Sequence, residues 1–269
     1  MSTPLTSGAW AHELSVARQA ACDAAELIRG RFGQKNDVQY KTPIEPLTEA
    51  DLIADQLLEA RIRDAFPDDA WMSEEGGDSS RRLFQDRVWI VDPLDGTREF
   101  IEGRPEFCVS IALVERGAPV VGVVVNPLTG EVFTARQGQG AHRNDAPLRV
   151  SDASVPQKAD IVVSRNESRS GMLSAFEGRL PLRPLGGMAN KLAVIAAGLA
   201  DGTFTCQQRC QWDVAAGMLL VTEAGGRVTR LDGRPLLLNQ PSPTFEGLLA
   251  TNGPLHDRLL AVVRDLVAP

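Results

Sequence analysis

Apolar residues recur at helical spacing in several stretches of the chain. The first covers residues 10–32, where small apolar side chains repeat along one side of the expected helix. A second starts at Thr48, a favourable N-cap residue with Asp51 in the capping-box position. Its apolar side is expected to hold Leu52, Ile53, Leu57, Leu58, Ile62 and Phe66. The same spacing predicts helices at residues 170–179, 190–198, 214–224 and 256–267, and a short one at residues 98–102.

Short apolar runs bounded by turn residues predict the strands. Residues 108–114, 120–126 and 131–135 are separated by short turns that contain glycine, so we expect them to form an antiparallel meander. The polar residues 34–46 predict a loop or an irregular hairpin, and residues 78–86 predict a mobile loop. Further strands are expected at residues 70–73, 88–91, 161–164, 182–185, 202–206, 228–231 and 247–251.

Helices that alternate with runs of strands predict a layered α/β protein of the α+β type. The chain has 269 residues, which is enough for one large domain or two closely packed ones. We place a boundary near residue 153. It separates an N-terminal α+β part, residues 1–152, from a C-terminal α/β part, residues 153–269, within one structural unit.

Composition and charge narrow the class of protein. The formal net charge is −7, which argues against a nucleic acid polymer as partner because such partners need a basic surface. A small anionic ligand remains compatible, because a bound cation can reverse the local field. No apolar run reaches the ~18 residues of a membrane span, and the N-terminus lacks the pattern of a signal peptide. We therefore expect a cytoplasmic protein without membrane contact.

The four cysteines, Cys22, Cys108, Cys206 and Cys210, form no pair with the spacing of a zinc site or a disulfide framework. Buried reduced thiols are therefore expected.

Candidate chemistry is concentrated in residues 88–103, which read VWIVDPLDGTREFIEG. Asp92 and Asp95 follow a buried-strand pattern, and the proline between them bends the chain so that both carboxylates and the Leu94 carbonyl can face one point. Gly96 allows close approach of the backbone. The Gly96 and Thr97 amides at the start of a helix can hold a phosphate. The Thr97 hydroxyl can orient a water molecule, with Asp51 as its acceptor.

Two other acids stand in similar surroundings. Glu74 follows a short strand and precedes glycines, and Asp213 precedes a helix. Four buried carboxylates repel one another unless cations or protons neutralise them, and Mg²⁺ prefers oxygen ligands. Two such ions could activate water and stabilise both oxygens of an in-line phosphate displacement. The alternatives are helix capping for Asp51 and a solvated loop pair for Glu74 and Glu75.

A different class of phosphatase has a similar sequence motif. Haloacid-dehalogenase-type phosphatases use D-x-D-G-T with the first aspartate as a covalent nucleophile. Here two residues, not one, separate Asp92 from Asp95, and a long segment with a Glu-Glu pair precedes them. We therefore favour the metal-phosphate site.

Three motifs in the same order resemble the signatures of the inositol monophosphatase superfamily. They are S-E-E-G from Ser73, W-I-V-D-P-L-D-G-T from Trp89 and Q-W-D-V-A-A-G from Gln211, with P-L-T-E-A-D ending at Asp51 as a further match. The resemblance implies a layered αβαβα sandwich, two or three Mg²⁺ ions per site, lithium sensitivity and a homodimer. It implies metal ligation by Glu74, Asp92, the Leu94 carbonyl, Asp95 and Asp213. It also implies catalytic roles for Asp51, Glu74 and Thr97.

The resemblance points to more than one class of substrate. Arg98-Glu99-Phe100 is similar to the K-E-F of CysQ-type 3′(2′),5′-bisphosphate nucleotidases, and residues 187–192, GMANKL, resemble their G-S-x-x-K stretch. Lys191 could bind a second phosphate, or it could be an exposed helix lysine. Inositol enzymes usually carry a glutamate where this chain has Cys206. Arg209 could bind phosphate or lie at the surface.

Three functions follow from these motifs. The first is hydrolysis of adenosine 3′,5′-bisphosphate, a small phosphorylated metabolite, to AMP and phosphate. The second is an inositol-1-monophosphatase or related sugar phosphatase. The third, of another class, is a non-catalytic sensor of a phosphorylated ligand. The expected substrate-binding residues are Asp95, Gly96, Thr97, Lys191 and Asp213.

Overall fold

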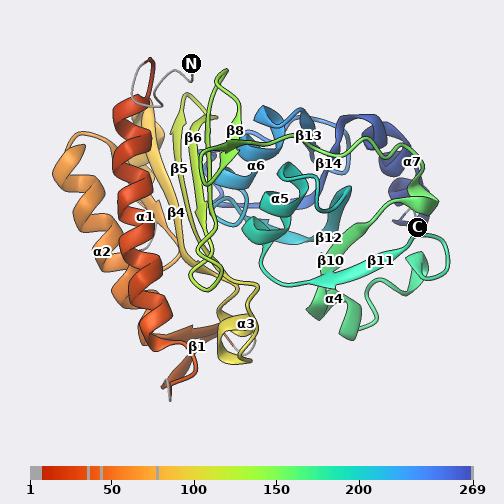
Figure 1. Cartoon of the computed structure of the whole chain (residues 1–269), viewed down its shortest axis with the longest axis horizontal. Helices are drawn as coiled ribbons and strands as arrows, with labels where there is room; N and C mark the ends of the chain where they lie inside the picture. The colour runs from red at the N-terminus through yellow and green to blue at the C-terminus, as the bar shows by residue number, and fades with distance from the viewer. Residues whose placement is uncertain (1–7, 35–36, 43–44, 77–78, 268–269) are drawn as a thin grey trace.

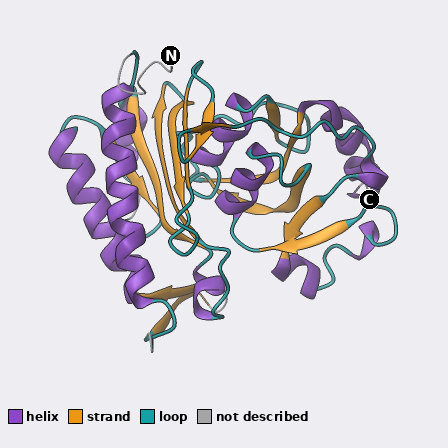
Figure 2. Cartoon of the chain, in the orientation of Figure 1, coloured by secondary structure: helices purple, strands orange, loops and turns teal. Residues whose placement is uncertain are grey.

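Helices and sheets alternate in five layers in the computed structural model, which describes residues 8–34, 37–42, 45–76 and 79–267. Helices α1 and α2 cover the outer face of a first sheet, and α5 and α6 lie between this sheet and a second one (Figure 1). Helices α4 and α7 lie beyond the second sheet (Figures 1 and 2). The predicted αβαβα sandwich is therefore confirmed.

The outer helix pair comprises α1, Ala11–Arg31, and α2, Glu49–Ala65. Small side chains on the buried side of α1 let it pack closely on α2 and the first sheet. The predicted apolar side of α2 is partly wrong, because Leu52 is 38% exposed whereas Asp55 is buried. The Ser73 hydroxyl donates a hydrogen bond to the Asp55 carboxylate, so this polar group has a partner inside the protein.

The first sheet has the strand order β3-β4-β5-β6-β7-β8-β9. Strands β3 and β4 are parallel, and all later neighbours are antiparallel, which confirms the predicted meander. Helices cover both faces, so β4 and β5 are buried along nearly their whole length. The strands are Ala70–Ser73, Arg87–Asp95, Cys108–Glu115, Ala118–Val125, Val132–Arg136, Ala141–Arg143 and Ala146–Pro147.

The segments before β3 and β4 contain more structure than expected. Strands β1, Val38–Thr42, and β2, Glu45–Thr48, form an irregular antiparallel hairpin. A 3-10 helix at Ser80–Phe84 replaces the expected mobile loop, because buried Arg82 donates to Asn239 Oδ1 at 2.7 Å and fixes it. Parts of these predictions, at residues 35–36, 43–44 and 77–78, lie outside the described residues.

The second sheet has the order β11-β10-β12-β14-β13 and combines parallel and antiparallel pairs. Its strands in chain order are Ile161–Ser164, Leu182–Leu185, Gly202–Cys210, Gly226–Thr229 and Thr244–Asn252. Helices α5, Met188–Ala196, and α6, Ala215–Glu223, fill the layer between the sheets, and α7 is His256–Val267. The division into residues 1–152 and 153–269 stays a prediction.

One predicted helix is wrong. The helix expected at residues 170–179 is instead α4, Arg165–Arg169, followed by a separate 3-10 turn at Ser174–Phe176. The Ser164 hydroxyl accepts a hydrogen bond from the Glu167 amide and caps the start of α4. Gly171 has φ 75°, a left-handed conformation that ends the helix.

The cysteine and membrane predictions can also be compared with the described residues. All four cysteines are free thiols, although Cys108 alone is fully buried and the other three are half-buried. Within the described ranges, every helix is too short or too polar to cross a membrane.

A buried histidine makes stability depend on pH. Both ring nitrogens of His256, a residue with no exposed surface, lie within 3.0 Å of the Thr229 and Thr251 hydroxyls. Burial lowers the pKa of His256 from 6.5 to about 4. The unfolded chain therefore binds a proton more readily, and the contribution of His256 to the free energy of unfolding should fall by about 3 kcal/mol as the pH drops from 6.5 to 4.

Urea unfolding of the parent and of His256→Gln across this pH range measures the effect. The carboxylates titrate in both proteins, so the difference between the two pH profiles isolates His256. We expect the variant to lose less stability on acidification. Parallel profiles would contradict the assignment.

Candidate active site

A cavity of about 450 Å³ opens between the two sheets where β4 ends and α5 and α6 begin. Residues from both halves of the chain line it. Asp92 and the segment 94–99 come from the end of the first sheet, and residues 185–188, 191, 208–210, 212 and 213 come from the second half.

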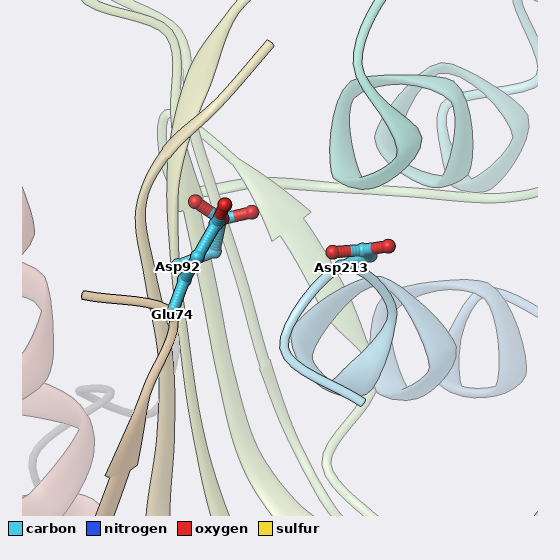
Figure 3. Close-up of side chains that lie close together, drawn as sticks. All are labelled: Glu74, Asp92 and Asp213. Atoms are coloured by element: carbon cyan, nitrogen blue, oxygen red, sulfur yellow. The ribbon is translucent and has the colours of Figure 1, made fainter. Parts of the chain in front are cut away.

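Three carboxylates meet in this cavity. One oxygen each from Glu74, Asp92 and Asp213 lies within 4.8 Å of the other two. Figure 3 shows the Glu74 and Asp92 carboxylates close together on adjacent segments of the first sheet, with Asp213 facing them from the start of α6. Three of the four acids that the sequence predicts to meet thus form one acidic cluster.

The electrostatics of this cluster favour a bound cation. Burial raises the pKa of Asp92 well above its usual range, and the charges of Glu74, Asp95 and Asp213 raise it further. Burial and the neighbouring carboxylates also raise the pKa of Glu74, and they raise that of Asp213 to about 7. Carboxylate groups that repel one another in this way are suitable ligands for a divalent cation, because its charge removes the repulsion.

Asp95 is placed differently from the other acids. It lines the cavity, but it is not one of the three clustered carboxylates. Its Oδ1 accepts the Met188 amide at 2.9 Å, and its Oδ2 accepts the Ala189 amide at 2.7 Å. These are donors at the start of α5, where a negative charge is stabilised by the helix dipole. Ligation of a metal by Asp95 stays a prediction.

The turn after β4 has the geometry that its sequence predicts. Gly96 has φ 94°, and a Cβ atom there would lie 2.9 Å from the Glu106 carbonyl oxygen, so only glycine fits. The Thr97 hydroxyl donates to Asp51 Oδ1 at 2.7 Å and lies 3.1 Å from the Leu94 carbonyl oxygen. Strand β4 continues to Asp95 rather than ending at Val91, because its pairing with β5 resumes after a bulge.

Asp51 has the capping role and also contacts the cavity residues. Its Oδ2 accepts the Thr48 amide at 2.8 Å, which confirms the capping box at the start of α2. Its other oxygen accepts the Thr97 hydroxyl. Burial raises the pKa of Asp51 even though these hydrogen bonds lower it.

Lys41 is a site residue that sequence reasoning did not assign. Its ammonium group donates to Glu74 and, at 2.9 Å, to Glu75 Oε1. Burial alone would lower the pKa of Lys41, but the two carboxylates outweigh it and raise that pKa. Burial raises the pKa of Glu75 to about 7. No local pattern marks this contact, because 33 residues separate Lys41 from Glu74.

A cationic group lies elsewhere in the same cavity. Lys191 is 4% exposed, and its Nζ donates to the Gly187 carbonyl oxygen at 2.8 Å. The alternative prediction, that Lys191 is an exposed helix lysine, is therefore wrong. Burial lowers the pKa of Lys191. Arg209 also lines the cavity and pairs with Glu167, a buried acid that sequence reasoning missed. Within the described residues, Arg209 Nε is buried without a hydrogen-bond partner.

Cys206 lies away from this group. It packs beside the apolar cluster between the second sheet and α7 and is not among the cavity residues. The pairing of β12 with β14 is interrupted between Thr205 and Gln208. The strand therefore presents Gln208, Arg209 and Cys210 to the cavity.

Comparison with known proteins gives the family. The family model described as "Inositol monophosphatase family" matches residues 10–268. The chain belongs to the inositol monophosphatase family. It is 34% identical over 264 residues to "Inositol monophosphatase 2" of Solanum lycopersicum, which covers 94% of this chain and 98% of that protein. The haloacid-dehalogenase alternative is therefore wrong.

Other relatives agree with this assignment. The chain is 34% identical over 246 residues to the "Fructose-1,6-bisphosphatase/inositol-1-monophosphatase" of Thermotoga maritima, covering 90% of this chain and 91% of that protein. The solved structure of a Thermotoga maritima IMPase superposes with a TM-score of 0.85 at 32% identity, over 95% of this chain and 98% of that one. As a member of the inositol monophosphatase family, the protein is a phosphatase of small phosphorylated substrates, and its acidic cluster could bind a metal.

Proposed function

We propose that this phosphatase is Mg²⁺-dependent and prefers a 3′(2′),5′-bisphosphate nucleotide, releasing AMP from adenosine 3′,5′-bisphosphate. The observation that carries the substrate proposal is the burial of Lys191 in the cavity that contains the acidic cluster. A buried ammonium group is unfavourable unless charges or hydrogen bonds compensate it. The Gly187 carbonyl oxygen already accepts one hydrogen bond from Lys191, and a second phosphate would add negative charge beside the ammonium group.

The metal is proposed from the donor set. Glu74, Asp92 and Asp213 would hold the ions, with Asp95 and the Leu94 carbonyl as further candidates, and two or three ions are expected. Bound there, Mg²⁺ would neutralise charge on the phosphate and make water a stronger nucleophile. Without such cations, the acidic cluster would repel a phosphate group.

The chain's own residues would orient the reactants. Because Thr97 gives its hydroxyl hydrogen to Asp51, its oxygen lone pairs stay available to accept a hydrogen bond from the attacking water. In this proposal, the Gly96 and Thr97 amides donate hydrogen bonds to the phosphate oxygens. Lys191 and Arg209 would bind the second phosphate and so hold the nucleotide in one orientation.

A second candidate is supported by the relatives. Several of them are named inositol monophosphatase, and inositol 1-phosphate would use the same acidic cluster. The polyol, however, offers only neutral hydroxyl groups to Lys191 and Arg209. The non-catalytic sensor is the least economical candidate, since Asp51 and Thr97 form a hydrogen-bonded pair beside the cluster that binding alone does not require. The homodimer, the cytoplasmic location and lithium sensitivity stay predictions.

Phosphate release from adenosine 3′,5′-bisphosphate and from inositol 1-phosphate, measured in parallel with Mg²⁺ and with EDTA, tests the proposal. We expect a higher kcat/KM for the bisphosphate and no turnover in EDTA. A preference for inositol phosphate would overturn the substrate proposal. Binding of both compounds without Mg²⁺-dependent turnover would favour the sensor.

A further inference from the structure

A second cavity of about 490 Å³ lies at one end of the second sheet. Its walls come from β12, the start of β14 and the segment 235–242 that precedes β14 in the chain (Figure 1 shows β12, β13 and β14). Gln208 lines both this cavity and the active-site cavity. Its volume is within the range of about 300–1,000 Å³ that is usual for sites of small molecules.

Much of the wall of this second cavity is apolar and fixed by the core. Leu236 and Phe245 are buried members of the central apolar cluster, so their positions are set by packing. Leu237, which is 60% exposed, lies at the cavity as well. Pro235 and Pro241 complete the apolar surface. A rigid surface of this kind suits a flat, largely apolar ring.

Arg230 supplies a cation with an unused donor. Its Nε is buried and has no hydrogen-bond partner among the described residues. Asp232 Oδ2 lies 3.9 Å from this nitrogen, which is too far for a hydrogen bond. The Arg230 side chain as a whole is 42% exposed and lines the cavity, so its terminal guanidinium nitrogens can donate to an anionic group there.

Two glutamines add acceptors at the same cavity. The side-chain amide of Gln208 donates a hydrogen bond to Glu246 Oε1 at 3.1 Å. The side-chain amide of Gln240 donates to the Leu238 carbonyl oxygen at 3.0 Å. Their side-chain carbonyl oxygens remain as acceptors for amino groups on a ligand. An apolar wall, amide acceptors and one arginine are together complementary to a heteroaromatic ring that carries an anion.

We propose that this second cavity binds a nucleoside monophosphate, with the phosphate on Arg230 and the base against Leu236, Leu237 and Phe245. The inference uses only the residues of the second cavity and does not depend on which substrate the active site hydrolyses. Because Gln208 belongs to both cavities, an occupied second cavity contacts one wall of the active site.

Calorimetric titration of the full chain with AMP in EDTA tests this site. Without Mg²⁺, the acidic cluster of the active site repels phosphate, so binding there is suppressed. Adenosine and inorganic phosphate are titrated in parallel, because adenosine has the base without the phosphate and inorganic phosphate has the anion without the base. We expect AMP to bind at one site per chain, at least about tenfold more tightly than either compound.

Variants distinguish the two cavities. Arg230→Ala should weaken AMP binding about tenfold or more, since it removes a charge-assisted hydrogen bond. Arg234→Ala is the matched control, because Arg234 lies 3.9 Å from the same Asp232 but is 83% exposed and outside the cavity. It should bind AMP as the parent does. Leu237→Glu, at an exposed position, should weaken binding because it puts a charged group where the base is proposed to lie, and thermal unfolding of each variant verifies its fold.

Three results with the parent, Arg230→Ala and Arg234→Ala overturn the proposal. They are no AMP binding, equal affinities of the parent and Arg230→Ala, or equal losses in Arg230→Ala and Arg234→Ala. AMP binding that is lost in Lys191→Met but kept in Arg230→Ala would place the ligand in the active site and also overturn it.

Discussion

Asp92→Asn is expected to lower kcat/KM by at least about a thousandfold while making the metal-free protein more stable. The activity falls because the variant removes one charge from the cluster that is proposed to bind Mg²⁺, and such stabilisation of a transition state amounts to several kcal/mol. The stability rises because Asp92 is 2% exposed, and burial and the neighbouring carboxylates disfavour its ionised form, which asparagine does not have.

The substitution is chosen so that it changes charge and little else. Asp92 Oδ1 accepts the Leu94 amide at 3.0 Å, and the carbonyl oxygen of asparagine can accept the same hydrogen bond. Asp95→Asn is a poorer test, because both Asp95 oxygens accept amides at the start of α5 and an asparagine NH₂ would face those donors. Its loss of activity would be mixed with a loss of stability.

Steady-state kinetics with Mg²⁺ and thermal unfolding in EDTA measure the two effects. Asp68→Asn, at an exposed position in the turn before β3, is the control and should leave both quantities unchanged. Near-normal kcat/KM in Asp92→Asn would show that the cluster does not hold the catalytic metal. An unchanged melting temperature in EDTA would contradict the electrostatic account of the cluster.

Lys191→Met is expected to lower kcat/KM for adenosine 3′,5′-bisphosphate by about 10- to 100-fold, which is the range for a lost hydrogen bond to a charged group. Methionine has a similar length and no charge, so the buried position stays filled. A monophosphate substrate has no second phosphate to bind Lys191, so its kcat/KM should change much less. The ratio of the two values is therefore the quantity to measure.

Lys158→Met, at an exposed lysine in the 3-10 turn Pro156–Lys158, is the matched control for Lys191→Met. It removes the same charge from the protein surface and should change neither substrate. Equal losses on both substrates in Lys191→Met would mean that Lys191 supports the structure of the cavity, for example through the Gly187 carbonyl oxygen, rather than recognising the second phosphate.

Local patterns in the sequence were sufficient to predict most elements and the class of enzyme, a phosphatase. The apolar periodicity predicted α1, α2, α5, α6 and α7 close to their observed positions, because each has a buried side or is buried all round. The helix expected at residues 170–179 failed because capping by Ser164 and the left-handed Gly171 decide its true position. The spacing of apolar residues does not reveal such single contacts.

What the sequence by itself determined is the set of acids and their surroundings: Glu74, Asp92 and Asp213 each stand where a buried run meets a turn or a helix start. The tertiary structure decided which groups they meet. It joined these three into one cluster, placed Asp95 against the amides of α5, brought Lys41 to Glu74 and buried Lys191 in the cavity. These contacts join segments far apart in the chain, and their geometry depends on how the two sheets pack around α5 and α6. Local spacing carries no information about that packing.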